Sequence, residues 1–255
     1  MMEAFGISDP GRVRKGNEDS YVCNELLQLF VVADGMGGHS AGEVASRLAI
    51  EAVEGFIRRS HDDSDFSWPY GVDPQLSLGG NRLRTAVHLA NRRVFRAAES
   101  CDDYTGMGTT LTAVLITGDR LAYGHVGDSR LYTLNGEGFR QITHDDSWVA
   151  TILANDPNIT PAELARHPMR HVLTNVLGAR EQVEVQLAEF HLAPGAVFLL
   201  CSDGLHGMVN DAGLERILRE GGPLDAMGRR LITAALEGGG HDNVTAVLIR
   251  TAAEP

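Results

Sequence analysis

Four aspartates stand beside apolar runs that have the character of core strands, and this placement is the feature of the sequence that could support chemistry. They are Asp34, Asp128, Asp203 and Asp242. Strands that pack together can bring their ends to one place, where several carboxylates repel one another unless a cation neutralises them. Hard divalent cations such as Mg²⁺ and Mn²⁺ prefer all-oxygen sites of this kind. The pattern therefore favours a carboxylate metal site.

A simpler interpretation competes for each aspartate taken alone. Asp34 and Asp203 each precede a glycine, and Asp-Gly is a common turn signal after a strand. Four aspartates that all stand beside strong strands fit that interpretation less well. At this level the residues indicate a metal site and do not name a reaction.

The elements that must position these aspartates are helices in pairs and short strands joined by tight turns. Apolar periodicity predicts helices from about 42 to 59, 81 to 99, 211 to 219 and 224 to 237. β-Branched and apolar runs predict strands at 29–33, 110–117, 120–126, 130–135, 183–192, 197–201 and 244–250. Gly118-Asp119 and residues 136–138 are typical of hairpin turns. This arrangement predicts an α+β fold of mostly antiparallel sheets covered by helices rather than a parallel winding.

Composition limits the classes of partner. The formal net charge of the 255 residues is −12, which opposes binding to nucleic acid or to an anionic membrane. No stretch approaches the ~18 apolar residues of a membrane span. Three widely spaced cysteines, Cys23, Cys101 and Cys201, form neither a disulfide framework nor a zinc pattern. We expect a cytoplasmic protein, by default a monomer.

Seven short motifs follow one another over nearly the whole chain. They are Arg14-Lys15-Gly16-Asn17-Glu18-Asp19-Ser20, Val32-Ala33-Asp34-Gly35-Met36-Gly37-Gly38-His39, Gly108-Thr109-Thr110, Val126-Gly127-Asp128-Ser129-Arg130, His167-Pro168 with Leu173–Gly178 behind it, Ser202-Asp203-Gly204-Leu205, and His241-Asp242-Asn243-Val244-Thr245. In content and order, these motifs resemble those of the type-2C metal-dependent serine/threonine protein phosphatases in their compact bacterial form. One motif alone would be weak, whereas seven in the family's order are specific.

The resemblance implies one catalytic domain over residues 1–255, folded as a four-layer α-β-β-α sandwich with two Mn²⁺ or Mg²⁺ ions at one edge. It implies that a water or hydroxide bridging the metals attacks phosphoserine or phosphothreonine on proteins. In the implied metal site, Asp34 bridges both ions, the Gly35 carbonyl binds one of them, and Asp203 and Asp242 bind the other. Glu18 acts mostly through a metal-bound water, and Asp128 helps to bind a weaker third ion. Arg14 is implied to hold the substrate phosphate. An arginine fork suits phosphate because it donates two parallel charge-assisted hydrogen bonds.

Two departures from the family pattern affect the mechanism. Met36 stands where many eukaryotic members carry a histidine that is thought to protonate the leaving group, and Gly207 stands where many members carry Asp or Asn, which weakens the third-metal assignment. Two proton sources remain: His39 in the same loop, and a water on a metal held partly by Asp128. We favour the water, because a bound cation acidifies it without any turn of the loop.

Residues 145–178 are expected to form a flap beside the site, with an ordinary helical insertion as the alternative. The resemblance implies phosphorylated proteins as substrates, with a serine/threonine kinase and its targets as signalling counterparts in a bacterium. Two other functions stay open at this stage. One is a metallohydrolase of small phosphoesters, and the other is an inactive module that binds phosphoproteins.

Overall fold

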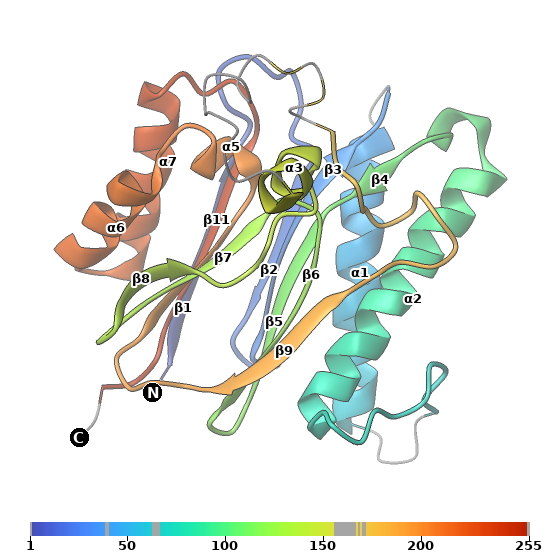
Figure 1. Ribbon diagram of the computed structural model, residues 1–255, viewed down its shortest axis with the longest axis horizontal. Coiled ribbons are helices and arrows are strands. Elements are labelled where there is room, and N and C mark those ends of the chain that lie inside the picture. The colour runs from blue at the N-terminus through green and yellow to red at the C-terminus, as the bar shows by residue number, and fades with distance from the viewer. Residues whose placement is uncertain are drawn as a thin grey trace.

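The computed structural model describes residues 2–38, 41–62, 67–155, 167, 169 and 172–253. Within them, two antiparallel sheets pack face to face, and helices cover the outer face of each sheet (Figure 1). The four-layer α+β sandwich expected from the sequence is confirmed. None of the helices in the described ranges is both long enough and apolar enough to span a bilayer.

The first sheet has the strand order β1-β11-β10-β7-β8. Its strands are β1 (Glu3–Asp9), β11 (Val244–Arg250), β10 (Val197–Cys201), β7 (Arg130–Asn135) and β8 (Gly138–Gln141). The two ends of the chain meet in it, because Glu3 pairs with Arg250 and Asp9 with Val244. Its outer face is covered by α5 (Asp203–His206), α6 (Asp211–Glu220) and α7 (Leu224–Glu237), at the left of Figure 1.

The second sheet has the order β2-β3-β5-β6-β9, with β4 paired to β3. Its strands are β2 (Asp19–Asn24), β3 (Leu29–Met36), β4 (Gly108–Thr109), β5 (Leu111–Thr117), β6 (Arg120–Val126) and β9 (Gln186–His191). The long helices α1 (Ala41–Asp62) and α2 (Leu78–Ser100) cover it, and the one-turn η1 (Asp102–Tyr104) follows α2. A further helix, α3 (Trp148–Asn155), lies at the upper end of the sandwich in Figure 1.

Successive side chains along a central strand point to opposite faces of the sheet, and both faces are covered. This explains why the central strands are apolar throughout. In β3, Val31 and Ala33 pack toward α1 and α2, whereas Phe30 and Val32 pack between the sheets. In β10, Leu199 packs toward α5–α7, and the residues on either side of it face the other sheet. Each strand is thus buried on both faces, which requires a continuous hydrophobic run.

The predicted elements are found within a few residues of their expected limits, with informative exceptions. Asp34 was expected after a strand, but β3 continues through it to Met36. The strand continues because Gly35 and Met36 pair with Thr109 and Gly108 of β4. The glycine is required for packing, since an added Cβ would lie 2.0 Å from the Gly42 carbonyl oxygen. The strands β1 and β2 were not predicted. Their side chains are mostly half-buried, so neither shows an apolar run.

Candidate functional site

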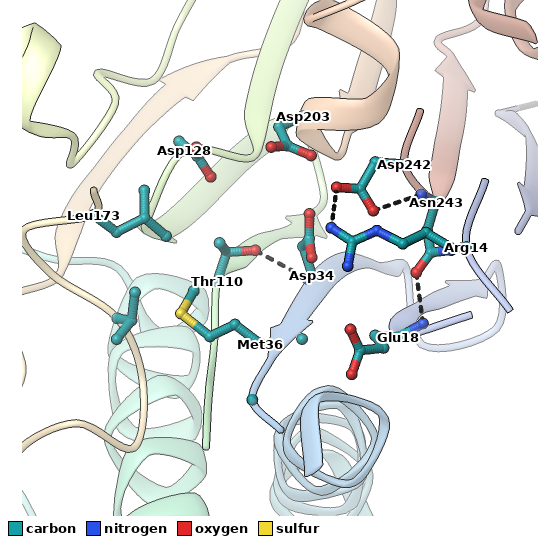
Figure 2. Close-up of a pocket in the computed structure, with 13 residues that line it drawn as sticks. Arg14, Glu18, Asp34, Met36, Thr110, Asp128, Leu173, Asp203, Asp242 and Asn243 are labelled. Atoms are coloured by element: carbon teal, nitrogen blue, oxygen red, sulfur yellow. Dashed lines mark hydrogen bonds and ion pairs between the residues drawn. The ribbon is translucent and has the colours of Figure 1, made fainter. Parts of the chain in front are cut away.

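A cavity of about 520 Å³ opens at the end of the sandwich where both sheets meet the loops before α1 and α5. It is lined by Arg14, Glu18, Asp34, Gly35, Met36, Gly37, Thr110, Asp128, Leu173, Val176, Asp203, Asp242 and Asn243. Every residue that the sequence predicted as a metal ligand or phosphate contact is in this set, and Figure 2 shows their side chains around one space. The one predicted site residue not placed there is His39, which lies outside the described residues.

Asp34 lines the cavity, and hydrogen bonds to its backbone N–H and carbonyl groups hold it in place. Its N–H donates to Thr110 Oγ1 at 3.0 Å, and its carbonyl oxygen accepts from Thr110 N and Thr109 Oγ1, each at 2.9 Å. The motif at residues 108–110 therefore holds the backbone of Asp34 in place. Burial, and then the nearby carboxylates of Asp19 and Asp203, raise the pKa of Asp34 well above its ordinary value.

Asp203 and Asp128 approach the same space from the far side. Asp203 is the first residue of α5 and directly follows the buried Ser202, while Asp128 follows β6 in a tight loop. Burial first, and then the charge of Asp203, raise the pKa of Asp128 to about 7. His206, at the end of α5, joins the two positions, because its Nε2 lies 2.9 Å from the Asp128 carbonyl oxygen.

Arg14 and Asp242 face each other at the open side. An Arg14 Nη donates to Asp242 Oδ2 at 2.7 Å, and about half of the arginine side chain is exposed. Asn243 ties this side together. Its Oδ1 accepts from Glu18 N at 2.7 Å, and its Nδ2 donates to the carbonyl oxygens of Pro10 and Gly16, each at 2.9 Å. The loop that bears Arg14 and Glu18 is thereby attached to the strand β11.

Asp19 is a site residue to which the sequence assigned no role. Its Oδ2 accepts hydrogen bonds from Ser202 Oγ at 2.7 Å and Thr245 Oγ1 at 2.6 Å, so it joins β2 of one sheet to the ends of β10 and β11 in the other. Its buried Oδ1 has no hydrogen-bond partner in the described part of the chain. Burial raises the pKa of Asp19 to about 7. The motif at residues 14–20 was the only signal that could have marked it.

An apolar wall closes another side of the cavity, formed by Met36, Leu173 and Val176. Figure 2 shows Met36 and Leu173 on this side, away from Arg14. Behind the wall, Asp146 accepts from Gly127 N at 3.1 Å and from Asn175 Nδ2 at 2.9 Å. Asp146 thus connects the loop before Asp128 to the wall, a role that the sequence did not reveal.

The predicted flap is described only at its two ends. Ser147 pairs with Leu173, and Trp148 N donates to the Val172 carbonyl oxygen at 2.9 Å, so the segment leaves and returns at the same place. The Trp148 ring stacks on His167 with centroids 3.8 Å apart. Residues 156–166, 168, 170 and 171 lie outside the described ranges.

The donor set fits hard divalent cations. Oxygen donors dominate the cavity, and burial, followed by neighbouring carboxylates, raises the pKa values of three carboxylates in its lining, Glu18, Asp34 and Asp128. The neighbouring Asp19 has an unpartnered buried oxygen. A cation would relieve this repulsion. As the side chains stand, no three acidic, histidine or cysteine groups within the described residues converge closely enough to enclose an ion, and Asp242 is turned to Arg14.

Comparisons with known proteins agree with this geometry. The chain is 42% identical over 241 residues to the serine/threonine protein phosphatase PstP of Mycobacterium tuberculosis, an alignment that covers 94% of this chain and 43% of that protein. It is 34% identical to the serine/threonine phosphatase stp of Listeria innocua, with 97% and 95% covered. The solved catalytic domain of PstP in complex with two manganese ions superposes with a TM-score of 0.81 at 39% identity, covering 98% of both chains.

The chain spans less than half the length of the M. tuberculosis relative but nearly the full length of the Listeria one. The family model described as protein phosphatase 2C matches residues 15–236, which include all of the predicted metal ligands except Asp242. A match over most of the chain, together with relatives above 30% identity, shows that the chain belongs to the protein phosphatase 2C family.

Proposed function

We propose that this chain is a Mn²⁺- or Mg²⁺-dependent phosphatase that removes phosphate from phosphoserine and phosphothreonine side chains of proteins. One observation carries the proposal: the carboxylates of Asp34, Asp128 and Asp203 face one cavity with Arg14 at its open side. The names of the relatives and the manganese bound by PstP support the assignment. We further propose that residues 1–255 act as one catalytic domain, since β1 and β11 pair along their length.

The residues would divide the metals as follows. Asp34 would contact both ions, Gly35 would hold one, and Asp203 and Asp242 would hold the other. Glu18 would act mostly through water, and Asp128 would hold a weaker third ion. Once bound, such cations acidify water at neutral pH and offset the negative charge of the phosphate. No protein nucleophile is needed in that chemistry.

Arg14 would bind the phosphate of the substrate. Its guanidinium already donates to a carboxylate oxygen of Asp242, and half of the side chain is open to the cavity mouth. The contact with Asp242 raises the pKa of Arg14, so the side chain stays charged throughout the physiological range. If Asp242 turns to a cation, the arginine fork becomes available to phosphate oxygens.

The leaving alkoxide needs a proton, and Met36 has none to give. Met36 lines the cavity at the position where the sequence raised this question. We propose that solvent in the cavity beside Asp128 supplies the proton, with His39 as the competing donor. The variant His39→Ala distinguishes between these two proton donors. Selective loss of activity on a phosphothreonine peptide, with an aryl phosphate spared, would favour His39, because the aryl leaving group needs little protonation.

The function is tested by hydrolysis of p-nitrophenyl phosphate with added Mn²⁺, with and without excess chelator. The same assay is then repeated with phosphothreonine, phosphoserine and phosphotyrosine peptides, and with a set of nucleotide and sugar phosphates. We expect metal-dependent turnover that favours the first two peptides. Higher turnover on small phosphates would make this a small-molecule phosphoesterase, and binding without turnover would make it a regulatory module.

We also propose that the chain acts in the cytoplasm, where it reverses the action of a serine/threonine kinase that phosphorylates the same proteins. The three free thiols, Cys23, Cys101 and Cys201, suit a reducing compartment. Deletion of the phosphatase should raise phosphothreonine on the targets of that kinase, measured by phosphoproteomics. Unchanged phosphorylation would separate this chain from kinase signalling.

A further inference from the structure

A groove on the outer surface of α1 and α2 carries positive charge that the catalytic site does not use. It has a volume of about 450 Å³ and is lined by Glu51, Ala52, Arg59, Leu89, Arg92, Arg93 and Arg96. Four arginines therefore face one glutamate, in a chain whose formal net charge is −12. A local positive surface on an acidic protein attracts anionic segments that the rest of the surface repels.

Most of this charge is not neutralised internally. Arg93 donates to Glu51 at 2.5 Å across the two helices. Arg59, Arg92 and Arg96 are exposed, and none of them makes a side-chain hydrogen bond or ion pair with another described residue. The groove thus presents three guanidinium groups whose donors are available to a partner.

The part of the groove between the arginines is apolar. Ala52 and Leu89 lie between the arginines, and Gly55 sits one turn beyond Ala52 on α1. The Arg59 side chain folds back over this glycine, since a Cβ built there would lie 3.4 Å from Arg59 Nη1.

The groove lies at a fixed distance from the cavity. The first turn of α1 abuts the site, because a Cβ at Gly42 would lie 2.5 Å from Glu18 Oε1. A rise of ~1.5 Å per residue places Glu51 roughly 14 Å and Arg59 roughly 25 Å along the helix from Gly42. An extended peptide at ~3.3 Å per residue covers that span with about four to eight residues.

We propose that this groove docks an acidic segment of the phosphorylated substrate protein, about four to eight residues away from the phosphorylated side chain. The proposal rests on the proposed phosphatase function and names a class of substrate for it. Aspartate and glutamate side chains of the segment would accept hydrogen bonds from Arg59, Arg92 and Arg96. Charge complementarity at an exposed surface acts mainly on the rate of association, so the docking should appear in kcat/KM and fade with salt.

The first experiment uses two phosphothreonine peptides that differ only in a tail, placed after a six-residue Gly/Ser linker. One tail has six glutamates and the other has six glutamines. The test variant is Arg92→Glu/Arg96→Glu. The matched control is Arg216→Glu/Arg229→Glu, which makes the same charge change on exposed positions of α6 and α7, on the opposite outer layer.

For the unmodified chain at low salt, kcat/KM should be about tenfold higher with the glutamate tail, within the range by which electrostatic steering changes association. The test variant should lose this preference, and the control variant should keep it. All three proteins should hydrolyse p-nitrophenyl phosphate equally, which also shows that each is folded. Equal kcat/KM for both tails in the unmodified chain, or an equal loss in the control variant, overturns the proposal.

A second measurement keeps the groove separate from catalysis. Fluorescein-labelled hexaglutamate carries no phosphate, and its anisotropy reports binding with no turnover. We expect a dissociation constant at least fivefold weaker for the test variant than for the control variant. Loss of peptide hydrolysis with this binding intact would defeat the proposed function and leave the groove standing. Tighter binding of a single-stranded oligonucleotide than of hexaglutamate would reject the acidic-peptide assignment.

Discussion

The two sides of the cavity differ in how they manage charge. On the inner side, Asp34 lines the cavity and Asp19 is buried beside it on the paired strand β2. The pKa values of both are raised, and no described basic side chain forms an ion pair with them. On the outer side, Arg14 and Asp242 come from loops, are partly exposed, and neutralise each other. We therefore expect the inner side to depend on a cation from solution, and we propose that the outer side exchanges its internal ion pair for substrate and metal contacts.

The largest effect should come from Asp34→Asn on the inner side. We expect kcat with Mn²⁺ to fall by a factor of ~10²–10³ or more, on the scale of groups that organise a catalytic centre. The metal-free protein should meanwhile melt no lower than the unmodified chain at neutral pH, because one repelling carboxylate is gone. Asp119→Asn, at an exposed hairpin turn, is the control. Near-normal turnover in Asp34→Asn would remove this residue from the site.

Arg14→Ala should have the next largest effect and tests the outer side. Loss of a charge-assisted contact to phosphate costs about 1.5–3 kcal/mol, so KM and the inhibition constant for product phosphate should each rise roughly tenfold to a hundredfold. Arg14→Lys keeps the charge without the fork and should be intermediate. Unchanged KM and unchanged phosphate inhibition in Arg14→Ala would place this arginine outside substrate binding.

Asp146→Ala tests the hydrogen bonds that connect the loop before Asp128 to the apolar wall of the cavity, and it should have a smaller effect. It removes acceptors for Gly127 N and the Asn175 amide, each worth about 0.5–1.5 kcal/mol. We expect faster hydrogen exchange at residues 172–178 and a threefold to tenfold lower kcat/KM on peptides, on the order of those energies.

Hydrogen exchange on the unmodified chain also tests the flap at residues 145–178, which should exchange faster than the core strands. Protection equal to that of β10 would contradict the flap.

The smallest effect concerns pH. Asp19 and Asp128 have folded-state pKa values raised to about 7, so their neutral forms stabilise the metal-free fold at low pH, and this contribution is lost as pH rises through 7. Bound cations favour the ionised forms instead. The difference in Tm between the Mn²⁺-loaded and metal-free proteins should therefore widen between pH 5 and pH 8. A constant difference in calorimetry would contradict the charge assignment of the inner side.

The sequence predicted most of the outer layers and central strands because their patterns are strong. Helices α1 and α2 have long apolar faces, and β3, β10 and β11 are buried on both sides. It also predicted the cavity-lining residues through their motifs. Long-range contacts could not be predicted from the sequence. Asp19 gains its role from Ser202 and Thr245, and no local pattern encodes that contact.

Local rules also misread two features. Asp34-Gly35 has the form of a turn, yet the glycine serves close packing against the start of α1 inside a continuing strand. Asp146 stands in a polar stretch with no periodicity, and its importance comes only from the groups that converge on it: Gly127 after β6, Asn175 beside the cavity wall, and Gln186 on β9. In both cases the tertiary partner decides the role of the residue.

The hydrogen bonds of Asp19 have a consequence for the order of folding. Asp19 is 183 residues from Ser202 and 226 residues from Thr245 along the chain, so these contacts close very long loops. Contacts of such separation form late, after local helices and hairpins. During synthesis, a ribosome-bound chain cannot complete the cavity until β11 has emerged. A nascent chain that lacks β11 should therefore have an incomplete cavity.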